Sequence, residues 1–136
     1  MHGYLGPVSS DLTPEELAFV QSAFEHARSG ELDRLVEVLD AGVPVNLTNG
    51  AGDTLLILAS YHVHGEVVQE LIERGADHGR VNDKGQTALA AAVLRRDPDI
   101  VGKLLDAGAD PGHGPRSAVA IATFFDLPEM LALLRR

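Results

Sequence analysis

The sequence predicts an all-α fold, a solenoid of stacked helix-turn-helix units, and three observations lead to this prediction. Landmark residues recur 33 positions apart, in the pairs Gly52 and Gly85, Thr54 and Thr87, Leu56 and Leu89, and Gly75 and Gly108. Apolar residues within each unit follow the spacing of one helix face. A glycine follows the longer helical stretches, where it can adopt the left-handed conformation that ends a helix. Such a period is typical of units that bury their apolar faces only by stacking on one another.

The composition fits one compact unit that does not bind nucleic acid. With 136 residues, of which 45% are hydrophobic and only 4% aromatic, the chain can form one core of aliphatic side chains. The formal net charge of −9 would repel a phosphate backbone. Cysteine is absent, which excludes disulfides and thiolate zinc sites. Because no signal-like leader and no apolar run of membrane-spanning length is found, we expect a soluble, cytoplasmic protein without membrane contact.

We expect residues 1–12 to form an extended or mobile lead-in to a single domain that covers residues 13–136. The first helix should begin at Thr13, whose hydroxyl can cap the first turn, and run to about Arg28. The second helix should end at Gly42. This helical pair lacks the turn that opens the later units, so we interpret it as an amino-terminal cap covering residues 13–48.

Three further units follow, at residues 49–81, 82–115 and 116–136. The first two each open with a turn and continue with a short helix, capped by Thr54 or Thr87, and a second helix closed by glycine. The last unit has Ser117 in place of the capping threonine and ends after one more helix length. A shortened last unit is typical of a carboxyl-terminal cap.

The two central units share two short motifs. One is Gly-x-Thr followed by apolar residues, which begins at Gly52 and again at Gly85; the other is Gly-Ala-Asp, which begins at Gly75 and again at Gly108. These motifs, in register, resemble the ankyrin repeat, and the resemblance covers roughly residues 23–134. It implies a non-enzymatic module that binds another protein and carries no cofactor. In that family partners dock on the concave surface formed by the β-turn loops, called fingers below, and the first helices of the units.

Carried over position by position, the resemblance implies eleven partner-facing residues on the fingers and first helices. They are Arg28, Asp53, Tyr61, His62, Asp83, Lys84, Gln86, Leu94, Arg95, Phe124 and Phe125. Tyrosine and arginine are common interface anchors, because tyrosine buries area at low entropic cost and arginine donates hydrogen bonds in a fixed fork. A different interpretation of Phe124 and Phe125 is that they close the end of the core. No catalytic residue and no metal ligand is expected.

The chain departs from the family pattern in the fingers and between the helices. The Thr-Pro-Leu-His motif has lost its proline, at Leu55 and Ala88, and its histidine, at Ile57 and Ala90. Val63 and Arg96 replace the glycine that joins the two helices of a unit. We therefore expect looser fingers and irregular loops between the helices.

Other residue constellations favour no catalytic or metal site. His62 and His64 are close in sequence, but a structural zinc site needs about four ligands. Carboxylates such as Glu66 and Glu70 recur at helical spacing opposite the apolar stripe, which indicates a solvated face. No nucleotide-binding or hydrolase motif is present.

Two functions of other classes stay open. The acidic surface could make the protein an inhibitor or immunity-type protein that blocks a basic partner. Exposed apolar residues at the end of the chain, Phe124, Phe125 and Leu127, could instead join two copies into a structural homodimer. The binding module itself is expected to be a monomer.

Overall fold

The protein is an all-α stack of paired helices in a computed structural model that describes residues 12–135. The helices of this part of the chain are α1 (Pro14–Ser29), α2 (Leu32–Asp40), α3 (Leu55–Tyr61), α4 (Gly65–Glu73), α5 (Ala88–Leu94), α6 (Pro98–Asp106), α7 (Ala118–Phe124) and α8 (Pro128–Leu134). Within residues 12–135 there is no strand, only an isolated bridge between Thr48 and Thr54. The predicted fold class is confirmed. Except for Leu12, the predicted lead-in lies outside the described residues.

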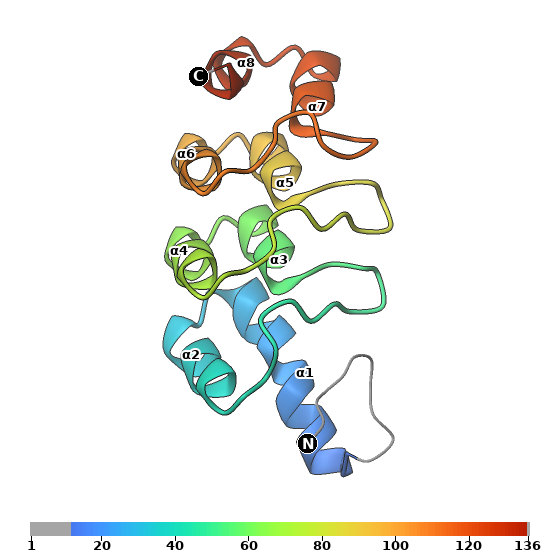
Figure 1. Ribbon diagram of the computed structural model, residues 1–136, viewed down its shortest axis with the longest axis vertical. Coiled ribbons are helices and arrows are strands. Elements are labelled where there is room, and N and C mark those ends of the chain that lie inside the picture. The colour runs from blue at the N-terminus through green and yellow to red at the C-terminus, as the bar shows by residue number, and fades with distance from the viewer. Residues whose placement is uncertain (1–11, 136) are drawn as a thin grey trace.

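The helices form two columns that run along the length of the molecule (Figure 1). Helices α1, α3, α5 and α7 make the inner column, and α2, α4, α6 and α8 make the outer column. The fingers project from the inner column, on the side away from the outer helices. Each inner helix packs against the inner helices of the adjacent units and against its own outer helix. None of the described helices has the length and apolarity needed to cross a bilayer.

The first helix starts with a capping box, as its sequence predicts. The Thr13 hydroxyl accepts a hydrogen bond from the Glu16 amide at 3.0 Å, and the Glu16 carboxylate accepts one from the Thr13 amide at 2.9 Å. Helix α1 has 16 residues, whereas each of the inner helices α3, α5 and α7 has 7. Its amino-terminal half therefore extends beyond the stack (Figure 1).

The other inner helices begin at the predicted capping residues. The hydroxyls of Thr54, Thr87 and Ser117 accept hydrogen bonds from backbone amides at 3.0, 3.1 and 3.1 Å. All three side chains are buried. Because each cap satisfies an amide inside the stack, it fixes the same starting point for the inner helix of every unit.

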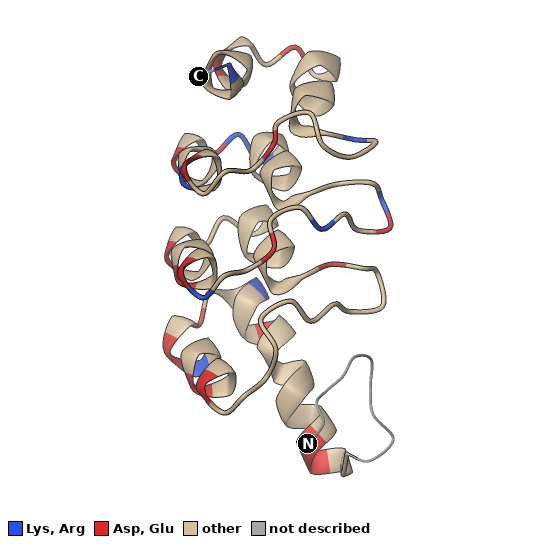
Figure 2. Cartoon of the chain, viewed as in Figure 1, with Lys and Arg blue, Asp and Glu red and all other residues tan. Residues whose placement is uncertain are grey.

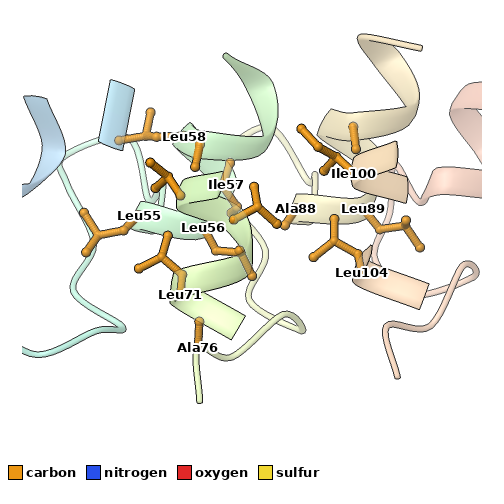
Figure 3. Close-up of a cluster of buried hydrophobic side chains, with 14 of the residues drawn as sticks. Leu55, Leu56, Ile57, Leu58, Leu71, Ala76, Ala88, Leu89, Ile100 and Leu104 are labelled. Atoms are coloured by element: carbon orange, nitrogen blue, oxygen red, sulfur yellow. The ribbon is translucent and has the colours of Figure 1, made fainter. Parts of the chain in front are cut away.

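The core lies between the two columns and continues from one unit to the next (Figure 3). In α3 every residue of 55–60 is buried, and in α5 every residue of 88–93 is buried. The outer helices contribute only one face, with Leu71, Ile100 and Leu104 pointing inward. Helices α3 and α5 are thus enclosed on all sides over these six positions, while the outer helices are amphipathic.

The loops between inner and outer helices share one backbone conformation, although three of the four lack glycine. Equivalent positions are occupied by Gly30, Val63, Arg96 and Asp126, with φ angles of 75°, 58°, 59° and 54°. Each loop is closed by a backbone hydrogen bond, such as that from the His64 amide to the Ala59 carbonyl at 2.9 Å. The expectation of irregular loops at Val63 and Arg96 is wrong, because these bonds hold the left-handed conformation. That conformation costs a non-glycine residue about 1–2 kcal/mol.

Exchanging glycine and valine at these equivalent positions should change stability in opposite directions. Val63→Gly should raise the free energy of unfolding by about 1 kcal/mol, because the relief of left-handed strain exceeds the entropic cost of glycine. Gly30→Val should lower the free energy of unfolding by about 2 kcal/mol or more, since a Cβ there would lie 2.5 Å from Nδ1 of His64. Urea unfolding followed by circular dichroism measures both changes. Destabilisation by Val63→Gly would show that the loop is not strained.

Candidate protein-binding surface

Asparagine side chains hold the fingers in shape. The Asn82 side-chain oxygen accepts hydrogen bonds from the amides of Lys84 and Gln86, both at 3.0 Å. Asn49 holds the preceding finger in the same way, accepting from the amides of Ala51 and Asp53 at 2.9 Å. Sequence reasoning recognised residue 49 only as part of a turn. These local hydrogen bonds fix the backbone of each finger within its own turn.

Adjacent fingers are also bonded to each other. The Asp83 amide donates to the Ala51 carbonyl at 3.0 Å, and the side-chain amide of Asn82 donates to the Asp53 carboxylate at 2.8 Å. The Arg116 amide donates to the Gly85 carbonyl at 2.9 Å in the next step. The fingers therefore form a connected strip, and the expectation of loose fingers is not supported.

A groove with a volume of about 350 Å³ lies between this strip and the inner helices. Ile57, Leu58 and Ala91 form part of its lining, and sequence reasoning did not single out these residues for the site. Seven of the predicted partner-facing residues also line it: Arg28, Asp53, Tyr61, His62, Asp83, Lys84 and Gln86. The structure thus brings together residues from three units that are about one repeat apart in sequence.

Tyr61 stands at the centre of a small cluster of rings and charge. Its side chain is 39% exposed, and the Arg95 guanidinium carbon lies 5.2 Å from the ring centroid, which is within the range of a cation-π contact. The His62 ring meets the Tyr61 ring edge-on at 5.2 Å. The predicted residue Leu94 is half-buried and packs against the core rather than into the groove.

Phe124 and Phe125 lie away from the groove, at the carboxyl-terminal end of the stack. Their rings meet edge-to-face at 4.9 Å, and the residues are 81% and 47% exposed. The interpretation that they close the core is therefore wrong. They form a separate exposed apolar surface on the last unit.

The histidines serve structural roles where the structure shows their partners. Nε2 of His64 lies 2.9 Å from the Arg28 carbonyl, and Nε2 of His113 lies 2.8 Å from the Gly79 carbonyl. Residues 12–135 contain no group of three or more His, Asp or Glu side chains placed to hold a metal ion. The pair His62 and His64 therefore finds no third ligand in this part of the chain.

The pKa of His62 lies below its ordinary value of 6.5. Burial in the groove is the main cause, and the positive charges of Arg28, His64 and Arg95 add to it. The nearby Asp53 carboxylate acts in the opposite direction. The surroundings of His62 thus disfavour the charged imidazolium.

Lysine and arginine side chains of the outer column form ion pairs, whereas several of those on the fingers and inner column do not. In the outer column, Arg74 pairs with Asp40 at 2.8 Å and with Glu70 at 2.7 Å, and Lys103 pairs with Asp99 at 3.3 Å. By contrast, three cations of the fingers and inner column form no ion pair with any residue of 12–135: Lys84, Arg95 and Arg116. Figure 2 shows acidic residues concentrated on the outer helices.

Comparison with known proteins gives one family and two partial relatives. Residues 24–114 match the family described as ankyrin repeats in three copies. A protein of Pseudomonas aeruginosa whose name describes it as an ankyrin repeat protein is 46% identical over 59 residues, which are 43% of this chain and 34% of the relative. The acyl-CoA-binding domain-containing protein 2 of Arabidopsis thaliana is 31% identical over 79 residues, which are 55% of this chain and 22% of the relative. The chain thus spans about a third or less of the length of these relatives.

Charge substitutions around His62 should move its pKa in opposite directions. Arg95→Ala should raise the His62 pKa, because it removes a positive charge that disfavours the imidazolium, and Asp53→Asn should lower it further. Since the pKa is lowered by folding, the stability that this site contributes is present above pH 6.5 and is lost as the pH falls through the lowered pKa. Titration of the His62 ring by NMR measures these shifts. Shifts of the same sign would contradict the described electrostatics of the groove.

Proposed function

The chain belongs to the ankyrin-repeat family, and from this premise we propose that it binds a protein partner in the groove between the fingers and the inner helices. Ankyrin repeats generally mediate protein-protein interaction. The protein acts as a small adaptor or modulator, without cofactor or catalytic residue, and functions as a cytoplasmic monomer. The observation that carries the proposal is that one groove gathers seven predicted partner-facing residues.

The side chains of this groove are arranged before any partner arrives. Tyr61 is held between Arg95 and His62, and Asp53 is held by Asn82. The backbone beneath them belongs to short helices fixed by buried caps. A side chain that is already ordered loses less conformational entropy on binding, so more of its contact energy remains as affinity.

A partner segment that carries carboxylates would meet Lys84 in the groove and Arg95 beside Tyr61, but it would also face Asp53 and Asp83, which line the groove. Lys84, Arg95 and Arg116 are free of intramolecular ion pairs in the described chain, so a partner's carboxylate need not displace an existing one. The overall net charge of −9 opposes such a segment at long range, but charges are screened beyond about 8 Å at physiological salt. Only the charges close to the groove therefore act strongly on a partner's carboxylate.

The alternative of an acidic inhibitor that blocks a basic partner has less support. The acidic outer column would have to meet the partner, yet several of its carboxylates are engaged by Arg74 and Lys103. A partner would have to compete with these pairs. If the outer column bound the partner, the affinity would fall steeply with rising salt concentration, and substitutions of outer-column carboxylates would lower it.

Removing the aromatic and cationic anchors should weaken partner binding without unfolding the protein. The partner is first captured from extracts of the native host on the wild-type protein and identified by mass spectrometry. Tyr61→Ala and Arg95→Ala should each cost about 1–3 kcal/mol of affinity for this partner, the range of strong interface residues. Isothermal titration calorimetry measures the cost, and circular dichroism checks the fold.

Glu66→Ala, on the exposed face of the outer helix α4, is the matched control and should leave the affinity unchanged. If neither groove substitution changes the affinity, the partner binds elsewhere and the proposal is wrong. If Glu66→Ala alone weakens binding, the acidic-inhibitor alternative is favoured.

A structural homodimer is a second candidate, supported by the exposed end of the last unit. Val119 is 39% exposed, whereas Leu56 and Leu89, at the same position of the preceding units, are 1% exposed because the next unit covers them. Phe124 and Phe125, at the carboxyl-terminal end of the same helix, are also exposed. Exposed apolar patches of this kind are typical of association surfaces.

Sedimentation distinguishes the two candidates. A homodimer through this surface should show a sedimentation coefficient that rises with protein concentration, and Phe124→Ser should abolish the rise, because it removes an apolar ring that is 81% exposed. Ser29→Ala, at an exposed position at the other end of the stack, should not. A constant monomeric value across concentrations eliminates the homodimer.

A further inference from the structure

A second and larger groove lies at the amino-terminal end of the inner column. Its volume is about 830 Å³, and it is formed by α1 on one side and by residues 44–50, which lead into the first finger, on the other. Several of its lining side chains are apolar: Leu12, Leu17, Val20, Phe24, Pro44 and Leu47. Arg28 lines both this groove and the smaller groove that is proposed to bind a partner, so the two are adjacent.

The long first helix leaves this groove uncovered in the described chain. Leu17 and Val20 belong to the part of α1 that extends beyond the stack, and both are only half-buried. No described helix lies beyond α1 at this end of the stack (Figure 1). Apolar side chains at this position would gain about 25 cal/mol for each Å² removed from water.

Gly50 lines the groove, and its backbone amide donates no hydrogen bond within residues 12–135. The amide of Asp83 donates to a carbonyl of the preceding finger, and Gly50 is the residue 33 positions earlier, in the first finger. No finger precedes it in residues 12–135, and the Gly50 amide has no hydrogen-bond acceptor among them. An extended segment lying in the groove could supply a carbonyl there, as an added strand does at a sheet edge.

The first eleven residues of the chain match this groove in chemistry and in reach. They are attached at Leu12, which itself lines the groove, and extended chain reaches about 3.3 Å per residue. They include Tyr4, Leu5 and Val8, and Asp11 is their only acidic or basic residue apart from His2. Their sequence thus suits an apolar surface better than most of this acidic chain does.

We propose that residues 1–11 bind in this groove as an intramolecular ligand, with a carbonyl accepting from the Gly50 amide and the side chains of Tyr4, Leu5 and Val8 against Leu17, Val20 and Leu47. A short tether gives an effective concentration of the order of 1 mM, so an intrinsic Kd of about 0.1 mM already gives about tenfold excess of the bound form. The bound segment would also occupy the space next to Arg28. It would therefore keep a partner from contacting the surface of the first unit beyond Arg28. This inference does not depend on whether a partner binds in the smaller groove.

Amide hydrogen exchange of the full chain, measured by NMR, tests the proposal. In the wild-type protein the Gly50 amide should exchange at least about tenfold more slowly than in the variant Tyr4→Ser/Leu5→Ser/Val8→Ser, which keeps the chain length but removes the apolar contacts. The Asp83 amide is the internal control, because its acceptor belongs to the described fold. Its exchange rate should be equal in the two proteins.

A control variant and a dilution series complete the test. Ser9→Ala/Ser10→Ala, in the same segment, should leave the Gly50 exchange rate unchanged, since those hydroxyls carry none of the proposed contacts. A tenfold dilution should also leave it unchanged, because an intramolecular ligand does not dissociate on dilution. Equal Gly50 exchange in the wild type and the triple serine variant overturns the proposal. Protection that disappears on dilution also overturns it, and points instead to the segment of a second copy.

Discussion

Every part of this structure depends on the burial of the inner helices between neighbouring units. Helices α3 and α5 present buried side chains in every direction over six consecutive positions, so neither could remain in water as an isolated seven-residue helix. Each is stable only because another unit covers it. The outer helices are amphipathic and complete the enclosure from one side. Stability is therefore shared between adjacent units rather than located in any one of them.

This mutual enclosure also determines where a partner can bind. Stacking places the corresponding turns of successive inner helices next to each other, so Tyr61 meets Arg95, which lies one position beyond its own equivalent, Leu94. It also holds the fingers close enough for backbone hydrogen bonds between them, as from Asp83 to Ala51. The groove is thus a product of the stack, and no single unit contains it.

Local signals in the sequence predicted much of the fold, whereas the details of the site depend on contacts between units. Thr13, Thr54 and Thr87 were predictable as caps because a capping hydroxyl bonds to amides only three positions away. The repeat register also anticipated that residues of successive units lie side by side, and seven of the predicted partner-facing residues line one groove. The half-burial of Leu94 was not predictable, because it depends on how neighbouring side chains pack. For Phe124 and Phe125 the sequence left two interpretations open, a partner-facing position and closure of the core, and only the packing of the last unit shows that both are exposed.

The shared conformation of the loops between paired helices affects how many repeat units are assigned to such a solenoid. The family match ends at residue 114, yet α7 and α8 form a further helical pair whose loop has Asp126 in the same left-handed conformation as Gly30. Backbone hydrogen bonds can thus preserve the geometry of a unit after its signature residues have been replaced. Motif counting will therefore undercount units at the ends of such arrays, and the left-handed residue between paired helices is the more durable marker of each unit.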